Sequence, residues 1–112
     1  MATMLSLVSC FGFYKRPAQL KASLIEKYGS DISIEKGTGS VMYNIDEEDF
    51  TEFLLIRHDS AGWGMIFYCD SSADAKKVYN DAKYYPDSLI KKQIGNNVYI
   101  GTETLYEMIK SA

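Results

Sequence analysis

Hydrophobic and polar positions follow two periods along the chain, one helical and one strand-like. Behind Pro17, which suits a first helical turn, an apolar stripe at helical spacing consists of Leu20, Leu24, Ile25 and Tyr28. Gly29 follows where a helix commonly ends in a left-handed residue. This pattern predicts a helix over residues 17–28, and the alternation in Asp31–Glu35 predicts a strand after it.

Two continuous apolar runs, Phe53–Ile56 and Met65–Tyr68, predict a hairpin of central strands around a turn at Asp59–Gly62. A turn of this length places His58 opposite Trp63 and makes both faces of the hairpin apolar. A sheet with helices on one side needs only one apolar face. The second face is therefore covered by the N-terminal segment, by a third helix or by another molecule. A homodimer through this sheet face is the partner we expect first, because symmetric pairs are the commonest oligomers.

The second half of the chain repeats the alternation of helix and hairpin. Ser71–Ser72 supplies the cap of a second helix, which Pro86 stops. Leu89–Ile94 and Asn97–Ile100 predict another hairpin, and Thr102 caps a last helix. We predict a single α+β domain over residues 1–112, a two-layer sandwich of an antiparallel sheet with helices mainly on one face.

The first ten residues are apolar and uncharged, and they allow two interpretations. In one, Leu5–Cys10 is an N-terminal strand. In the other, Leu7–Cys10 is the remnant of a bacterial lipoprotein leader, and Cys10 is the lipid anchor that holds the domain at a cell envelope; otherwise the domain is cytoplasmic. The sequence contains no run of eighteen apolar residues, so no transmembrane helix is predicted. Cys10 and Cys69 form one bridge or remain two free thiols.

Composition limits the partners. The chain has 112 residues, 46% hydrophobic and 24% charged, as expected of a globular domain, and its net charge of -3 argues against a nucleic-acid partner. Nine tyrosines contribute to an aromatic content of 13%. Exposed tyrosine gives contact area at low entropic cost, so the tyrosines near predicted element ends are either a contact surface or edge-of-core packing. They are Tyr84, Tyr85, Tyr99 and Tyr106.

The single histidine limits the catalytic chemistry. In the predicted register, Cys69 lies roughly 17 Å from His58 at strand rise, too far for a Cys–His dyad. His58 is then a packing residue against Trp63, or it joins Arg57 and Trp63 in the site of a small enzyme or ligand carrier. No catalytic residue is predicted.

The acidic segment Asp46–Asp49, with Glu52, lacks the spacing of a calcium loop, and no His/Cys set suits zinc. We therefore predict neither metal nor cofactor.

Lys36–Ser40 lacks the spacing of a phosphate loop and is interpreted as a hairpin turn. A solvated turn is the simplest interpretation of the acidic segment. A second hypothesis makes it the surface of a phage or mobile-element protein that blocks a basic site on a host factor.

Two segments carry a family resemblance. Phe67–Tyr79 joins a strand through a small polar cap to an Ala/Lys-rich helix, and Lys91–Thr102 joins a basic strand through a tight turn to a strand and a closing helix. This order resembles small uncharacterised α+β domains of Gram-positive bacteria, many of them secreted lipoproteins. The resemblance implies a ferredoxin-like or related sandwich and lipidation of Cys10, and it carries no catalytic residue.

The leading hypothesis is a non-catalytic binding or interaction module of unknown ligand, dimeric and envelope-associated. The alternatives are the small enzyme or ligand carrier with a site near His58 and Trp63, and the acidic inhibitor. The binding residues proposed from the sequence are Arg57, His58, Trp63, Tyr84, Tyr85 and Tyr99.

Overall fold

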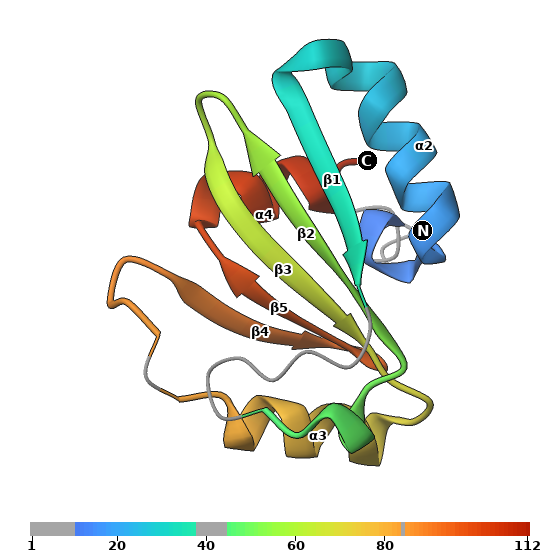
Figure 1. Ribbon diagram of the computed structural model, residues 1–112, viewed down its shortest axis with the longest axis vertical. Helices are drawn as coiled ribbons and strands as arrows, with labels where there is room; N and C mark the ends of the chain where they lie inside the picture. The colour runs from blue at the N-terminus through green and yellow to red at the C-terminus, as the bar shows by residue number, and fades with distance from the viewer. Residues whose placement is uncertain (1–10, 38–44, 84) are drawn as a thin grey trace, which may run out of the picture.

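A computed structural model describes residues 11–37, 45–83 and 85–112, and its centre is a five-stranded antiparallel sheet (Figure 1). The strand order is β1-β2-β3-β5-β4. Along the chain the elements are η1 (Phe11–Tyr14), α2 (Pro17–Tyr28), η2 (Gly29–Asp31), β1 (Ile32–Gly37), η3 (Glu47–Asp49), β2 (Glu52–His58), β3 (Gly62–Tyr68), α3 (Ser72–Asp81), β4 (Ile90–Ile94), β5 (Asn97–Gly101) and α4 (Glu103–Lys110). The α+β class and the antiparallel sheet predicted from the sequence are confirmed.

The strands are connected in two ways. Strands β1, β2 and β3 form a meander in which each strand pairs with the next. Strand β5 pairs antiparallel with both β3 and β4, so β3 and β4 run in the same direction on either side of it. The β3–α3–β4 connection is therefore a split β-α-β unit, the feature that this sheet shares with ferredoxin-like sandwiches.

Helices cover both faces of the sheet. On the α2–α4 face, the buried side chains of the sheet are packed with those of η1, α2 and α4 in one apolar cluster that includes Leu20, Leu54, Ile66 and Leu105. On the opposite α3 face, a second cluster includes Met65, Phe67, Val78 and Val98. In Figure 1, α4 passes behind the sheet and α3 runs across its lower end. Two of the three described α-helices thus share one face, and both apolar faces of the central hairpin have helical cover.

The register of the central hairpin corrects the sequence prediction by one residue. His58 is opposite Gly62 rather than Trp63, and Trp63 is opposite Arg57. Gly62 has a φ of 87°, a left-handed conformation that suits glycine, and the turn before it is one residue shorter than expected. Because side chains alternate between faces, this slip moves every β3 side chain to the other face relative to β2.

Local capping signals mostly lie where the sequence places them. Helix α2 begins at Pro17, and Gly29 follows it with a φ of 58°. Ser71 Oγ accepts a hydrogen bond from the Asp74 amide, and Thr102 Oγ1 accepts one from the Leu105 amide. Helix α3 is shorter than predicted, since it ends at Asp81 rather than near Pro86. The predictions for residues 1–10, for Thr38–Ser40 and for Tyr84 fall outside the described residues.

Candidate functional site

The structure separates the three residues proposed at the hairpin end. Arg57 and Trp63 are cross-strand neighbours on the α3 face, whereas His58 lies on the α2–α4 face. The His58 ring packs edge-on against Tyr28, with 5.3 Å between ring centroids and 79° between planes. The expected stacking of His58 on Trp63 is therefore wrong, for the same reason that the register is wrong.

His58 holds the hairpin turn together. Its Nδ1 accepts hydrogen bonds from the backbone amides of Ser60 and Ala61, each at 3.2 Å. The Ser60 hydroxyl lies 3.4 Å from the same ring nitrogen, so this nitrogen contacts three groups of its own turn. Cys69 follows the far end of β3, so the two residues lie at opposite ends of the hairpin, in keeping with the prediction that they form no dyad.

The tyrosines proposed as a contact surface are mostly packed inside. Tyr99 is fully buried, and its hydroxyl donates to the Thr102 carbonyl at 2.7 Å, so it is a core residue and not a surface one. Tyr85 is half-buried against the α3-face cluster, 5.8 Å from Lys91 Nζ. Tyr106 is half-buried too, with its ring 5.1 Å from Phe13. The edge-of-core alternative describes these three tyrosines better than a contact surface does.

A polar cleft of about 570 Å³ lies at the end of the hairpin away from His58, and we call it the strand-end cleft. The junction of η1 with α2, the start of β2, the end of β3 and the β4–β5 turn contribute to it. Its lining residues are Tyr14, Lys15, Arg16, Pro17, Thr51, Glu52, Tyr68, Cys69, Asp70, Asn96 and Asn97. Its volume falls within the range of small-molecule sites, whereas its lining is more polar than most of them.

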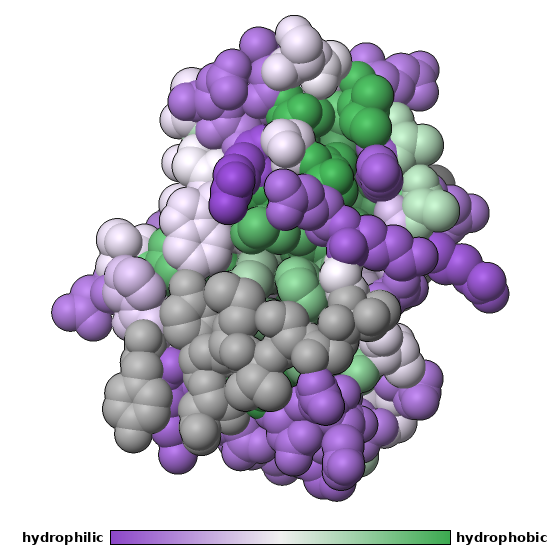
Figure 2. All heavy atoms as spheres, in the orientation of Figure 1, coloured by the Kyte–Doolittle hydropathy of each residue, from purple (hydrophilic) through white to green (hydrophobic). Residues whose placement is uncertain are grey.

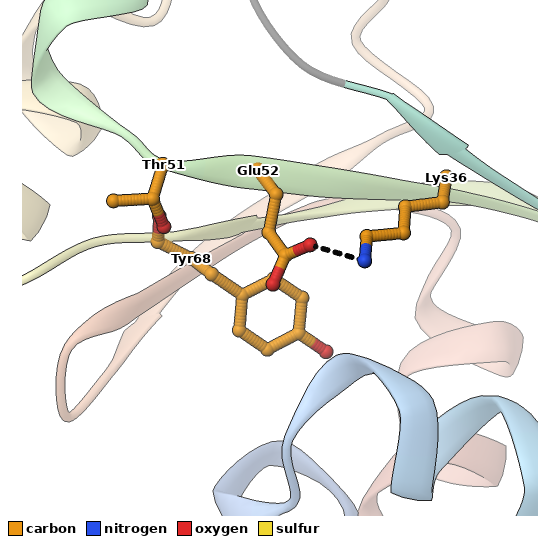
Figure 3. A network of polar contacts seen from close by, with 4 residues as sticks. All are labelled: Lys36, Thr51, Glu52 and Tyr68. Carbon is orange, nitrogen blue, oxygen red and sulfur yellow. Dashed lines mark hydrogen bonds and ion pairs between the residues drawn. The ribbon is translucent and has the colours of Figure 1, made fainter.

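Tyr68 is the most unusual residue of the cleft. The side chain is 7% exposed, and among the described residues its hydroxyl is the one buried side-chain oxygen or nitrogen without a hydrogen-bond partner. Burial first, and the Glu52 carboxylate second, raise the pKa of the phenol above its ordinary value. Figure 3 shows the Glu52 carboxylate beside the ring and the hydroxyl directed towards the blue helix, α2. A buried, unpaired hydroxyl is costly, so its presence beside a cleft calls for a reason.

Two carboxylates form the acidic wall of the cleft, which we define as Glu52 and Asp70. Glu52 Oε2 lies 3.0 Å from the ammonium of Lys36 on the neighbouring strand (Figure 3). The Lys36 side chain is 59% exposed, and ion pairs of this kind contribute little to stability. Asp70 is exposed and has no ion pair within the described part of the chain.

Two basic residues form the cationic wall, which we define as Lys15 and Arg16. Lys15 is engaged, since its ammonium donates to Ser23 Oγ at 2.8 Å and to the Ala112 backbone oxygen at 2.7 Å. The Arg16 backbone amide donates to Gln19 Oε1, while the exposed guanidinium has no ion pair among the described residues. Opposite charges thus line one cleft without pairing across it.

The cleft also holds a thiol of low reactivity. Cys69 is a half-buried free cysteine. Burial, followed by the carboxylates of Asp74, Asp49 and Asp70, raises the pKa of this thiol to about 12. The thiolate is the nucleophilic form, so Cys69 is a poor nucleophile at neutral pH. Within residues 11–37, 45–83 and 85–112, no group of three His, Cys, Asp or Glu side chains is arranged to hold a metal ion.

Comparisons with protein-family models, with curated proteins and with solved structures gave no match to this chain. Among the described residues, no helix has the length and apolar character needed to cross a bilayer.

The sequence-based prediction missed the strand-end cleft. Its residues come from four places in the chain that are far apart, and none of them forms a motif. The available signal was the position of Asp70 and Asn96 directly after strands or in turns, where polar side chains of different elements can meet. Many other polar residues also follow strands or lie in turns, so Asp70 and Asn96 can be recognised as cleft residues only when the strand order is known.

Proposed function

We propose that the protein is a non-catalytic binding module that holds a small polar ligand in the strand-end cleft. The observation that carries this proposal is the buried Tyr68 hydroxyl, which has no hydrogen-bond partner among the described residues. Beside it, the exposed Arg16 guanidinium and the exposed Asp70 carboxylate line the same cleft and make no ion pair within those residues. A ligand that bonds to these groups recovers interactions that the chain does not make by itself. The chemistry favours binding over turnover, because His58 is engaged in its turn and the Cys69 thiol is held protonated.

The experiment is a screen of small polar metabolites by ¹H–¹⁵N NMR, with the Asn96→Trp variant and the matched control Asn80→Trp. Asn96 is exposed at the cleft, so a tryptophan there fills the cleft, whereas Asn80 is exposed on α3 away from it. We expect saturable shifts of the Cys69, Asp70 and Asn97 amides in the wild type and in Asn80→Trp, and their loss in Asn96→Trp. Binding that survives Asn96→Trp unchanged, or conversion of a bound compound, contradicts the proposal.

A homodimer is a less favoured part of the same hypothesis. A second molecule is one of the three covers that the sequence allows for the second apolar face, and in the structure helices pack on both faces. Apolar side chains do remain visible on the side of the molecule turned to the viewer in Figure 2, and Leu55 and Trp63 on the α3 face are half-buried. Sedimentation at micromolar concentration tests the dimer, which a single monomeric species contradicts.

Attachment to a cell envelope rests on Cys10 and on the resemblance to lipoprotein domains. The mass of the natively expressed protein is the test: a diacylglycerol adduct at Cys10 supports attachment, and an unmodified Cys10 contradicts it. The hypothesis of an acidic inhibitor of a host factor stays a prediction.

A further inference from the structure

We infer that the ligand of the strand-end cleft is a zwitterion with a free ammonium and a free carboxylate, such as an amino acid or a short peptide with unblocked ends. This inference rests on the proposed function and names the class of ligand. Arg16 binds the carboxylate, Glu52 binds the ammonium, and Lys36 is the counter-ion that occupies Glu52 until the ligand displaces it.

The two walls of the cleft present complementary charges without neutralising each other. The guanidinium of Arg16 has no ion pair in the described part of the chain, although Glu52 and Asp70 line the same cleft. An anion alone is repelled by the acidic wall, and a cation alone is repelled by the cationic wall. A molecule that carries both charges satisfies both walls, and the guanidinium can grip a carboxylate in the bidentate manner.

A ligand ammonium can replace the Lys36 ammonium in the ion pair with Glu52. Lys36 Nζ lies 3.0 Å from Glu52 Oε2, which shows that this carboxylate accepts an ammonium in the folded protein. The Lys36 side chain is 59% exposed and that of Glu52 is 24% exposed, so the ammonium can swing into water at small cost while the carboxylate stays in place. A ligand ammonium can then take the position of Lys36 Nζ.

The buried hydroxyl of Tyr68 supplies a second and independent observation. Glu52 and Tyr68 are cross-strand partners on the same face, and the carboxylate lies beside the phenol ring in Figure 3. Within the described part of the chain the hydroxyl has no hydrogen-bond partner, although its residue is only 7% exposed. A ligand ammonium at Glu52 therefore lies next to the Tyr68 ring, and a polar group of the ligand can give the hydroxyl the bond that it lacks once the side chains that cover it move aside.

The test compares four forms of one dipeptide by NMR titration: L-alanyl-L-alanine, its N-acetyl form, its C-terminal amide and the doubly blocked form. We expect the free dipeptide to bind most tightly, each block to weaken binding about tenfold or more, and the shifts to map to the cleft. Equal affinity for the four forms overturns the inference, and so does the absence of cleft shifts with the free dipeptide.

Variants assign each end of the ligand to its wall. Arg16→Gln should remove the preference for the free carboxylate and keep the preference for the free ammonium, whereas Glu52→Gln should do the reverse. Lys36→Gln should tighten binding of the free dipeptide severalfold, because it removes the competing ammonium. This gain in affinity is an effect that a purely structural role of Lys36 does not produce, so unchanged or weaker binding contradicts the role given to Lys36.

The matched controls are Glu26→Gln on the exposed side of α2 and Lys77→Gln on the exposed side of α3, and both should leave all four affinities unchanged. The two proposals fail in different ways. If sugars or other solutes without two opposite charges shift the cleft amides while the dipeptide does not, the binding function stands and the zwitterion is wrong. If no solute shifts the cleft amides, the binding function itself is wrong.

Discussion

Tyr68 and Tyr99 occupy similar positions and have opposite hydrogen-bonding states. Both belong to the apolar cluster of the α2–α4 face, and burial is the main cause that raises the pKa of each phenol above its ordinary value. The Tyr99 hydroxyl donates to the Thr102 carbonyl at 2.7 Å, whereas the Tyr68 hydroxyl has no hydrogen-bond partner among the described residues. The surroundings of Tyr99 are complete within the fold, while those of Tyr68, beside the strand-end cleft, leave one bond unmade. The difference separates a buried hydroxyl whose hydrogen bond is made within the fold from one whose hydrogen bond is left unmade among the described residues.

The largest expected effect comes from closing the space around Tyr99. A Cβ at Gly101 would overlap the Gly64 Cα and lie 2.5 Å from the Tyr99 hydroxyl oxygen. Gly64 and Gly101 face each other on the paired strands β3 and β5, whose backbones are held by the sheet and cannot move apart. Gly101→Ala should therefore lower the free energy of unfolding by about 3 kcal/mol. Urea unfolding measures this loss, with Ser33→Ala on the exposed edge strand as the control. A loss of less than about 0.5 kcal/mol would contradict the close approach of β3 and β5 at Gly64 and Gly101.

An alkaline titration tests the property that the two tyrosines share. Their raised pKa values mean that the folded protein keeps phenol protons that the unfolded chain releases above its ordinary pKa of 10.0. The unfolded state then binds fewer protons, so stability is complete below pH 10 and falls as pH rises beyond it. At pH 11 each tyrosine should cost about 1 kcal/mol.

The measurement is urea unfolding at pH 9 and pH 11. Tyr68→Phe and Tyr99→Phe should each lose less stability between these two values than the wild type loses. A decline that is the same in all three proteins contradicts the assignment of the pH dependence to these phenols.

Removing the Tyr99 hydroxyl should have a moderate effect. Tyr99→Phe deletes the bond to the Thr102 carbonyl, which still accepts a hydrogen bond from the Tyr106 amide at 3.1 Å. Because the carbonyl keeps one partner, we expect a loss of about 1 kcal/mol at pH 7. Thermal unfolding measures it, and an unchanged midpoint would mean that the bond contributes nothing net.

The smallest effect on stability is expected at Tyr68. Tyr68→Phe removes a buried hydroxyl that makes no hydrogen bond to the described residues, so the free energy of unfolding at pH 7 should stay within about 0.5 kcal/mol of the wild type or rise slightly. In the same variant, ligand binding in the strand-end cleft should weaken. A loss of stability as large as that of Tyr99→Phe would abolish the distinction between the two tyrosines.

The local sequence determined the elements and most of their ends. Helix α2 begins at Pro17 and is followed by Gly29. The hydroxyls of Ser71 and Thr102 cap α3 and α4, and the two apolar runs form the central strands β2 and β3. These features depend on backbone conformation and on neighbours within a few residues, which is why they can be derived from the chain alone. The doubly apolar hairpin also predicted correctly that both sheet faces need cover.

Only the tertiary structure decided the register and the site. A turn one residue shorter than expected placed Trp63 beside Arg57 and His58 on the other face, because a slip of one residue exchanges the faces of a strand. The strand order and the packing of α2 then brought Arg16, Glu52 and Asp70 to one cleft. Such groups are distant in sequence, and they meet through contacts between elements that no local pattern encodes.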